Sequence, residues 1–190
     1  MGSNINKELL LIMEDYNLFL CSEKQIEMPI EVTKKKVNHP TSLYVEKKVK
    51  SSQQLGEDIF DCEIRNKDIK NYSYQLLTDA ISKRVLFRLD EGNGTHRNNI
   101  PTIPLKEQQI PTPHFHRYDE NGRFFAYRTN ELETKSCLDI KQGVVLFCQE
   151  AKIIPSEKNA KIEIAIQEDG VISSELLNDS DPLNGVDFNL

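Results

Sequence analysis

The sequence predicts an α+β domain whose core is an antiparallel sheet. Three observations support this fold class. Apolar and polar side chains alternate in several short runs between residues 41 and 128, apolar side chains recur at three- and four-residue steps near the N-terminus, and turn residues separate the runs. The chain has 190 residues, of which 38% are hydrophobic, so one modest core can form. We expect a single domain over residues 1–167 and an acidic tail over residues 168–190.

The N-terminal helix is predicted by an apolar stripe that begins after a capping residue. Asn6 is a candidate N-cap, because its short side chain can accept a hydrogen bond from the first turn. Five side chains then fall on one predicted face: Leu9, Leu10, Met13, Tyr16 and Leu20. The helix must end before Pro29, since an interior proline loses a hydrogen bond and clashes with the preceding turn. The basic run of residues 34–36 is interpreted as a solvated turn.

The antiparallel sheet is predicted to have five or six strands. Alternating runs lie at residues 41–47, 59–64, 72–76, 84–89, 114–118 and 123–128. In the second run, we expect Phe60, Cys62 and Ile64 to face the core, with the other face of the sheet solvated. Residues 138–149 predict a later helix, although Gly143 weakens that pattern. Residues 161–167 alternate as a last strand.

Charge is distributed unevenly along the chain. The whole sequence carries 24 basic and 30 acidic residues, a net charge of −6. Residues 82–128 hold 8 basic against 5 acidic side chains, or +3, whereas residues 157–190 hold 2 against 8, or −6. An acidic protein is a poor general binder of nucleic acid, because affinity for the backbone requires neutralised phosphates. A basic region that is separated from the acids can still bind phosphate.

The sequence indicates a cytoplasmic chain that does not bind membranes. No apolar run approaches the ~18 residues of a membrane span. The N-terminus lacks the pattern of a secretion signal, and the four cysteines show no paired spacing typical of zinc sites or disulfide frameworks. We therefore expect reduced cysteines, no metal and no cofactor.

The residues best suited to chemistry lie between positions 95 and 128. Three of the four histidines, His96, His114 and His116, fall within 21 residues. Four prolines between residues 95 and 113 exclude a central strand or helix there, so this long segment is predicted to be a loop. If the strands at 84–89 and 114–118 are neighbours, the loop must return, and it would bring His96 and Arg97 close to the other two histidines.

On the strand at residues 114–118, side chains two positions apart share a face. His114, His116 and Tyr118 therefore point to one side, while Phe115 and Arg117 point to the other. We expect Phe115 to pack inward and the histidine face to meet solvent.

Three interpretations of this histidine group remain open. In the first, His96, His114 and His116 act as general acid and base on a phosphodiester, and Tyr118 orients a histidine. Arginine would then bind the phosphate, and the candidates are Arg97, Arg117 and Arg128. In the second, the three imidazoles bind a metal such as zinc. We rank the metal lower, because no carboxylate or thiolate ligand is evident and nearby arginines would repel a cation. In the third, these residues have structural or binding roles without catalysis, as polar surface residues often do.

The same segments resemble an uncharacterised family of small bacterial and prophage proteins. The resemblance covers about residues 60–150 and is carried by five stretches: Asn66–Leu76, Val85–Asp90, His96–Asn98, Pro113–His116 and Phe125–Tyr127. The chain departs from the family pattern after Asn98, where the usual turn is replaced and the loop is longer, and at Phe125, where the family has tryptophan. The resemblance names no reaction. It implies a role in conflict between phage, plasmid and host.

Two functions are expected from these observations. The first is a small ribonuclease-like protein of the toxin type, metal-independent, with RNA as substrate. The second is a non-catalytic interaction protein that inhibits a host defence nuclease, with the acidic tail occupying a basic groove on that protein partner. The histidine and arginine residues favour the first function, and the sequence pI of 5.3 favours the second.

Overall fold

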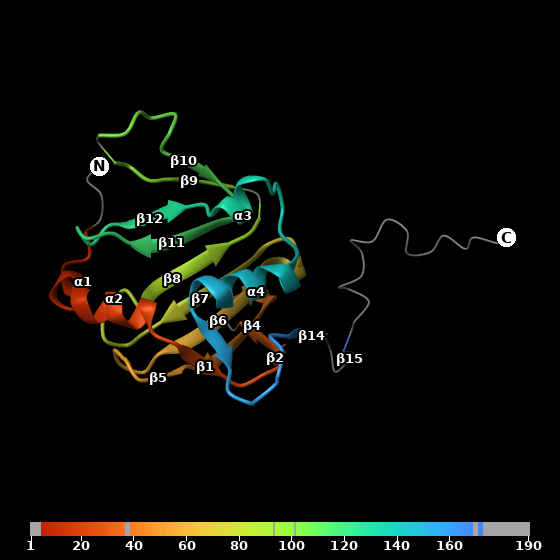
Figure 1. The fold of residues 1–190 in the computed structure, drawn as a ribbon. Coiled ribbons are helices and arrows are strands. Elements are labelled where there is room, and N and C mark those ends of the chain that lie inside the picture. Colours follow the sequence, from red (N-terminus) through yellow and green to blue (C-terminus); the bar gives the residue numbers. More distant parts are fainter. Residues whose placement is uncertain (1–4, 37–38, 93, 101, 169–170, 173–190) are drawn as a thin grey trace.

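The computed structural model describes residues 5–36, 39–92, 94–100, 102–168 and 171–172, which form the predicted α+β fold (Figure 1). The helices are α1 (Lys7–Leu11), α2 (Met13–Cys21), α3 (Asn130–Glu133) and α4 (Ile140–Glu150), with one 3-10 turn, η1 (Arg65–Lys67). The strands are β1 (Lys24–Ile26), β2 (Ile30–Val32), β3 (Lys34–Lys36), β4 (His39–Lys48), β5 (Lys50–Ser51), β6 (Ile59–Ile64), β7 (Tyr72–Leu77), β8 (Val85–Asp90), β9 (Thr95–Arg97), β10 (Gln109–Pro111), β11 (His114–Tyr118), β12 (Phe124–Tyr127), β13 (Ile153–Pro155), β14 (Ile164–Glu168) and β15 (Val171–Ile172). Most of the predicted acidic tail lies outside the described residues.

The main sheet has the strand order β12-β11-β8-β7-β6-β4-β3, and all of its neighbouring pairs are antiparallel. The six longer strands are those that the alternating runs predict. The seventh is the three-residue β3, formed by Lys34–Lys36. The interpretation of this run as a turn is therefore wrong. A lysine-rich segment suits the outer position of a sheet, where charge discourages pairing with another chain.

Shorter strands pair outside the main sheet and connect distant parts of the chain. β1 lies between β13, to which it is parallel, and β5. The predicted last strand is β14, which begins at Ile164 and pairs in parallel with β2 instead of joining the main sheet. Both parallel pairs bring the segment after α4 back to the first third of the chain.

The N-terminal helical segment is divided at Ile12, which has a non-helical backbone (φ −121°, ψ 24°). The predicted cap is confirmed, since Asn6 Oδ1 accepts a hydrogen bond from the Leu9 amide at 3.1 Å. Leu9 and Tyr16 are fully buried, but Leu10 is 40% exposed. The expectation of one continuous apolar stripe is therefore wrong, because a break in the helix changes which side chains face the core.

Tyr16 joins the helical segment to the main sheet. Its hydroxyl donates to the carbonyl of Leu86 at 3.1 Å and accepts from the amide of Tyr118 at 3.0 Å. These two groups lie on β8 and β11, just beyond the last paired residues of the two strands. One side-chain hydroxyl thus satisfies the backbone where the ladder ends.

The helix α4 covers the apolar face of the main sheet, as Figure 1 shows. Phe147 is fully buried there, and its ring centroid lies 5.5–5.7 Å from those of Phe60, Tyr74 and Phe87. This confirms the predicted later helix. Gly143 faces Tyr72 so closely that a Cβ atom would collide with the phenol. The glycine is therefore a packing requirement of this face.

The opposite face of the sheet carries polar side chains on its central strands, and we call it the polar face. Register places them in cross-strand pairs, with His114 opposite Asp90 and His116 opposite Arg88. The polar side chains continue onto β7, where Ser73 lies opposite Asp90 and Gln75 lies opposite Arg88. In the described part of the chain, no helix has the length and apolar character needed to cross a bilayer.

Candidate functional site

The β9–β10 hairpin folds over the polar face and is held there by Asn98. The Asn98 side chain donates to the Ala126 carbonyl at 2.8 Å and accepts from the Ala126 amide at 2.6 Å. Ala126 lies on β12, the outer strand of the main sheet, so the carboxamide replaces a partner strand at this position. The hairpin stem is thus anchored beside β11 and β12.

The hairpin brings the three histidines together. The ring centroid of His96, on β9, lies 4.6 Å from that of His116 and 6.1 Å from that of His114. His114 and His116, both on β11, are 4.6 Å apart by the same measure. The expected return of His96 to the strand is confirmed. We call these three residues the histidine cluster.

The histidine cluster is not on an open surface. His114 is 3% exposed and His116 is 4% exposed, while Phe115 on the other face is 1% exposed. The expectation that the histidine face meets solvent is therefore wrong, although Phe115 packs inward as predicted. The alternation correctly assigned side chains to faces, but it could not show that a hairpin from the intervening loop covers the polar one.

Asp90 is the functional residue that the sequence did not reveal. Its Oδ2 lies 3.2 Å from His116 Nε2. Its Oδ1 accepts hydrogen bonds from Arg88, with Nε at 2.8 Å and Nη2 at 2.5 Å, and from Arg65 Nη2 at 3.5 Å. In the sequence, Asp90 stands at the start of an Asp-Glu-Gly-Asn-Gly stretch, which is typical of a turn. Its position two residues after Arg88 on one strand was the available signal, since both must share a face.

His116 has unused hydrogen-bonding capacity. Its Nε2 is at ion-pair distance from Asp90, but the ring is not oriented for a well-aligned hydrogen bond, and within the described residues neither ring nitrogen has a hydrogen-bond partner. Buried ring nitrogens without partners are costly, and they are found where a ligand or a proton transfer uses them. The ring is held in place by stacking on Phe124, with centroids 5.1 Å apart and planes inclined by 14°.

The electrostatics of the cluster favour one carboxylate and two neutral imidazoles. Burial alone would raise the pKa of Asp90, but its interaction with His116 and the charge of Arg88 outweigh burial and hold this pKa at about 2. Burial, together with the nearby His116, lowers the pKa of His114 to about 4. The same two causes lower the pKa of His96. At neutral pH, His114 and His96 are therefore uncharged.

The tautomer of His114 follows from its surroundings. Its Nδ1 lies 3.1 Å from the carbonyl oxygen of Pro111, which can only accept, so the neutral ring carries its proton on Nδ1. Nε2 then bears a lone pair. A neutral imidazole with a fixed ring and an available lone pair is suited to act as a base.

Two adjoining pockets surround the cluster. The histidine pocket, of about 530 Å³, is lined by all three histidines and by Asp90, Arg88 and Arg65. The basic pocket, of about 540 Å³, is lined by the cations Lys83, Arg84, Arg97 and Arg123 and by Tyr118. His96 and Phe124 line both pockets. Glu91 also lines the histidine pocket, and burial raises its pKa to about 7.

The structure brings only some of the predicted site residues together. Tyr118 and Arg97 line the basic pocket next to the cluster. Arg117 lies on the opposite face of the sheet, where its guanidinium covers the rings of Phe125 and Tyr127. Arg128 is engaged elsewhere, because its Nη2 donates to the carbonyls of Leu132 and Lys135. Arg65 and Arg88 occupy the positions beside the histidines.

The same residues also satisfy a minimal geometric criterion for metal binding. One ligand atom each from Asp90, His114 and His116 lies within 4.8 Å of the others. The carboxylate that the sequence appeared to lack is thus present. However, Arg88 and Arg65 already contact its Oδ1, and two guanidinium groups beside a ligand oppose the binding of a cation.

Comparison with known proteins identifies the family. The model of a family of unknown function, DUF6978, matches residues 14–153, about three quarters of the chain. The chain belongs to this family. The DUF6978 match runs from α2 to β13 and includes every residue of both pockets. Neither a curated protein nor a solved structure is significantly similar to the chain.

Proposed function

We propose that the chain is a ribonuclease-like enzyme that cleaves phosphodiester bonds without a metal ion. One observation carries the proposal: three imidazoles, a partly buried carboxylate and two guanidinium groups converge in a single pocket. This combination supplies a base, an acid and an anion-binding group within the reach of one phosphate.

The charges of the histidine pocket favour an anion. Arg65 and Arg88 contribute two positive charges, whereas Asp90 contributes one negative charge. Glu91 adds only part of a negative charge at neutral pH, because its pKa is raised to about 7. Arginine recognises phosphate oxygens through paired N–H groups, and Arg88 retains solvent access on 28% of its side chain.

The tautomers and contacts support the following roles in the proposed reaction. Nε2 of His114 removes the proton from a ribose 2′-hydroxyl, and the 2′-oxygen then bonds to the adjacent phosphorus. The bond from phosphorus to the 5′-oxygen breaks, and protonated His116 gives its proton to that oxygen. Asp90 balances the positive charge that His116 carries before transfer. The products are a 2′,3′-cyclic phosphate and a 5′-hydroxyl, and proton exchange with water restores both rings.

The remaining residues support these two histidines. His96 and Arg88 are placed to donate to the phosphate oxygens as charge develops on them. Tyr118 positions the acid indirectly, because its ring packs on Phe124 with centroids 4.8 Å apart and Phe124 stacks on His116. Arg117 and Arg128 receive no role in this proposal, since other contacts occupy them.

The proposal is tested with purified protein, total RNA and the variants His114→Gln and His116→Gln. Glutamine keeps a polar side chain in each site but cannot transfer protons near neutral pH. We expect each variant to cleave about 10²- to 10⁴-fold more slowly than the native chain, with products that end in a cyclic phosphate. Lys141→Ala, on the exposed side of α4, serves as the matched control.

Three results would count against the proposal. These are the absence of cleavage by the native chain, unchanged cleavage by both glutamine variants, and loss of cleavage with a chelator that a divalent cation restores. Circular dichroism of each variant separates a chemical effect from unfolding. The alternative function, inhibition of a defence nuclease through the acidic tail, stays a prediction, because most of that tail lies outside the described residues.

A further inference from the structure

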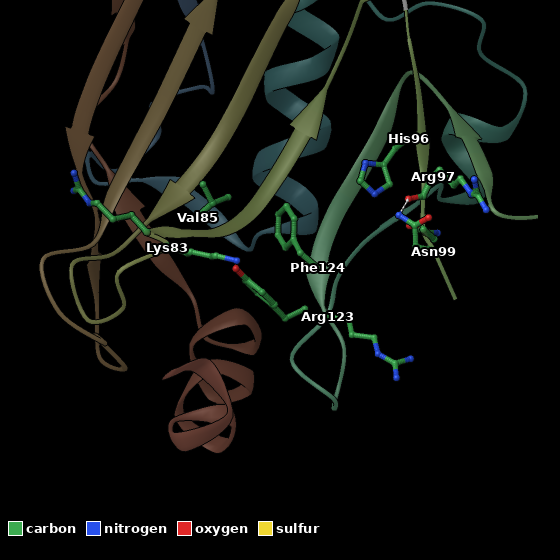
Figure 2. A pocket seen from close by; sticks show the side chains of 10 residues that line it. Lys83, Val85, His96, Arg97, Asn99, Arg123 and Phe124 are labelled. Carbon is green, nitrogen blue, oxygen red and sulfur yellow. Dashed lines mark hydrogen bonds between the residues drawn. The ribbon is translucent and has the colours of Figure 1, made fainter. Parts of the chain in front are cut away.

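The basic pocket next to the histidine cluster has walls of one charge. Lys83 and Arg84 come from the turn between β7 and β8, Arg97 comes from β9, and Arg123 precedes β12. None of the described residues that line the pocket is acidic. In Figure 2, His96 and Arg97 lie on the hairpin side of the pocket, Lys83 lies on the opposite side, and Phe124 stands between them.

The cations of this pocket are not neutralised by neighbouring acids. Within the described residues, none of Lys83, Arg84, Arg97 and Arg123 forms an ion pair. Among the described residues, Arg97 makes one weak side-chain contact, from Nε to Gln108 Oε1 at 3.4 Å, and the buried Nε of Arg123 has no hydrogen-bond partner. In a chain with a net charge of −6, such a local group of unpaired cations indicates an anionic ligand.

Aromatic side chains complete the pocket. Phe124 and Tyr118 lie side by side and both line it. Cations around an aromatic surface are what single-stranded nucleic acids require, because phosphates contact the cations while a base lies against a ring. A base inside a duplex is already stacked on its neighbours and cannot make this contact.

The pocket is continuous with the proposed reaction centre. His96 and Phe124 form the boundary between the two pockets and line both. The His96 ring lies 4.6 Å from the ring of His116, so a chain of nucleotides that passes over this boundary places successive residues in the two pockets.

We propose that the basic pocket binds the nucleotide next to the scissile phosphate of single-stranded RNA. This inference rests on the proposed function and adds the class of substrate. The cations of Lys83 and Arg97 contact the phosphate from opposite walls, and the base lies on the surface formed by Phe124 and Tyr118.

The test measures binding separately from cleavage. The probe is a fluorescent single-stranded oligoribonucleotide whose 2′-hydroxyls are methylated, so it lacks the nucleophile and stays intact. Anisotropy is followed for the native chain and for the double variant Lys83→Ala with Arg97→Ala. We expect binding to weaken about 5- to 10-fold. The slope of log K against log salt should become shallower by about 0.7, because the two cations together neutralise one phosphate of the single strand.

Two further variants make the test specific. The control Lys141→Ala with Lys158→Ala removes the same charge from exposed positions outside the pocket and should bind like the native chain. Phe124→Leu removes the aromatic ring and should weaken binding without changing the salt slope, since stacking releases no counterions. A duplex of the same sequence should bind more weakly than the single strand.

The outcomes separate this inference from the proposed function. Equal weakening by the control variant, or equal affinity for the duplex, would overturn the inference. So would cleavage and binding by the Lys83→Ala, Arg97→Ala variant at native levels, although the proposed function would then survive. If the pocket variants lose affinity but the native chain never cleaves RNA, the binding site is supported while the proposed catalysis fails.

Discussion

The two faces of the main sheet differ in how they use burial. On the apolar face, α4 packs aromatic rings against aromatic rings, and hydroxyls such as that of Tyr72 donate to backbone carbonyls. On the polar face, the β9–β10 hairpin buries His114 and His116, yet both ring nitrogens of His116 lack hydrogen-bond partners within the described residues. The first face is built for stability. The second leaves buried polar atoms without hydrogen-bond partners within the described residues, which costs stability.

The largest effect is expected on the apolar face. Phe147→Ala removes a fully buried ring and should lower the free energy of unfolding by about 3–5 kcal/mol, because a cavity remains among the neighbouring rings. Urea denaturation measures this loss. Gln149→Ala, exposed on the same helix, should cost less than about 0.5 kcal/mol. If both substitutions had similar effects, α4 would not be the main source of stability.

A smaller effect, and one that depends on pH, is expected on the polar face. The folded state lowers the pKa of His114 from 6.5 to about 4, so between these values the unfolded chain binds more protons. The contribution of His114 is complete above about pH 6.5 and is lost as the pH drops toward 4. Glu91, whose pKa is raised to about 7, contributes in the opposite direction between about pH 4.5 and 7. From His114 we expect a loss of about 2 kcal/mol, less than the full shift implies, because solvent enters the pocket.

Urea denaturation of the native chain and of His114→Gln at several pH values measures that loss as the difference between the two curves, which should change between pH 6.5 and 4 because only the native chain has the His114 contribution. The Asp90 pKa of about 2 lies below its unfolded value, so its contribution is lost only below about pH 3.8 and is separable. An identical pH dependence in His114→Gln and the native chain would show that His114 is not held neutral by the fold.

A third prediction concerns the contact between α4 and the sheet. Alanine normally stabilises a helix relative to glycine, but at Gly143 its Cβ atom would collide with the Tyr72 phenol. We expect Gly143→Ala to lower the free energy of unfolding by about 1–2 kcal/mol. In a Tyr72→Phe background, where the hydroxyl is absent, the cost should shrink. The same cost in both backgrounds would place the strain elsewhere.

The smallest effect on global stability is expected at the hairpin anchor. Asn98→Ala removes both hydrogen bonds to Ala126, but their loss affects an outer strand that water can solvate, so the cost should stay below about 1 kcal/mol. The local effect should be clear: with the hairpin loosened, solvent reaches the histidines, and the pKa of His114 rises from about 4 toward 6.5. Histidine titration by NMR measures this. An unchanged pKa would show that the hairpin does not bury the cluster.

The fold was largely predictable because local patterns determine it. The alternation of apolar and polar side chains predicts the six longer strands. Asn6 predicts the start of the first helix, because capping depends only on neighbouring residues. The short strands β1, β2, β5 and β13 were not predicted, because two or three residues carry no periodicity. The position of Lys34–Lys36 was also missed, since an outer strand tolerates the same lysines as a turn.

The candidate site was only partly predictable, because it depends on contacts between distant segments. The spacing of His114 and His116 gave their shared face, and the return of the loop gave the proximity of His96. The burial of the cluster depends on the Asn98 contact with Ala126, 28 residues away, which no local pattern shows. Asp90 was missed because its partner is set by the register of β8 against β11. The register between β8 and β11, which are not consecutive in the sequence, cannot be predicted from the residues of either strand alone.

The Asn98 carboxamide has a consequence for the solubility of the protein. β12 is an outer strand of the main sheet, and the backbone groups on the outer side of such a strand can template pairing with a strand from another molecule. By occupying both the amide and the carbonyl of Ala126, Asn98 interrupts the row of free groups that such an intruding strand would need. Asn98, which anchors the β9–β10 hairpin, therefore also opposes polymerisation of the protein through the outer edge of β12.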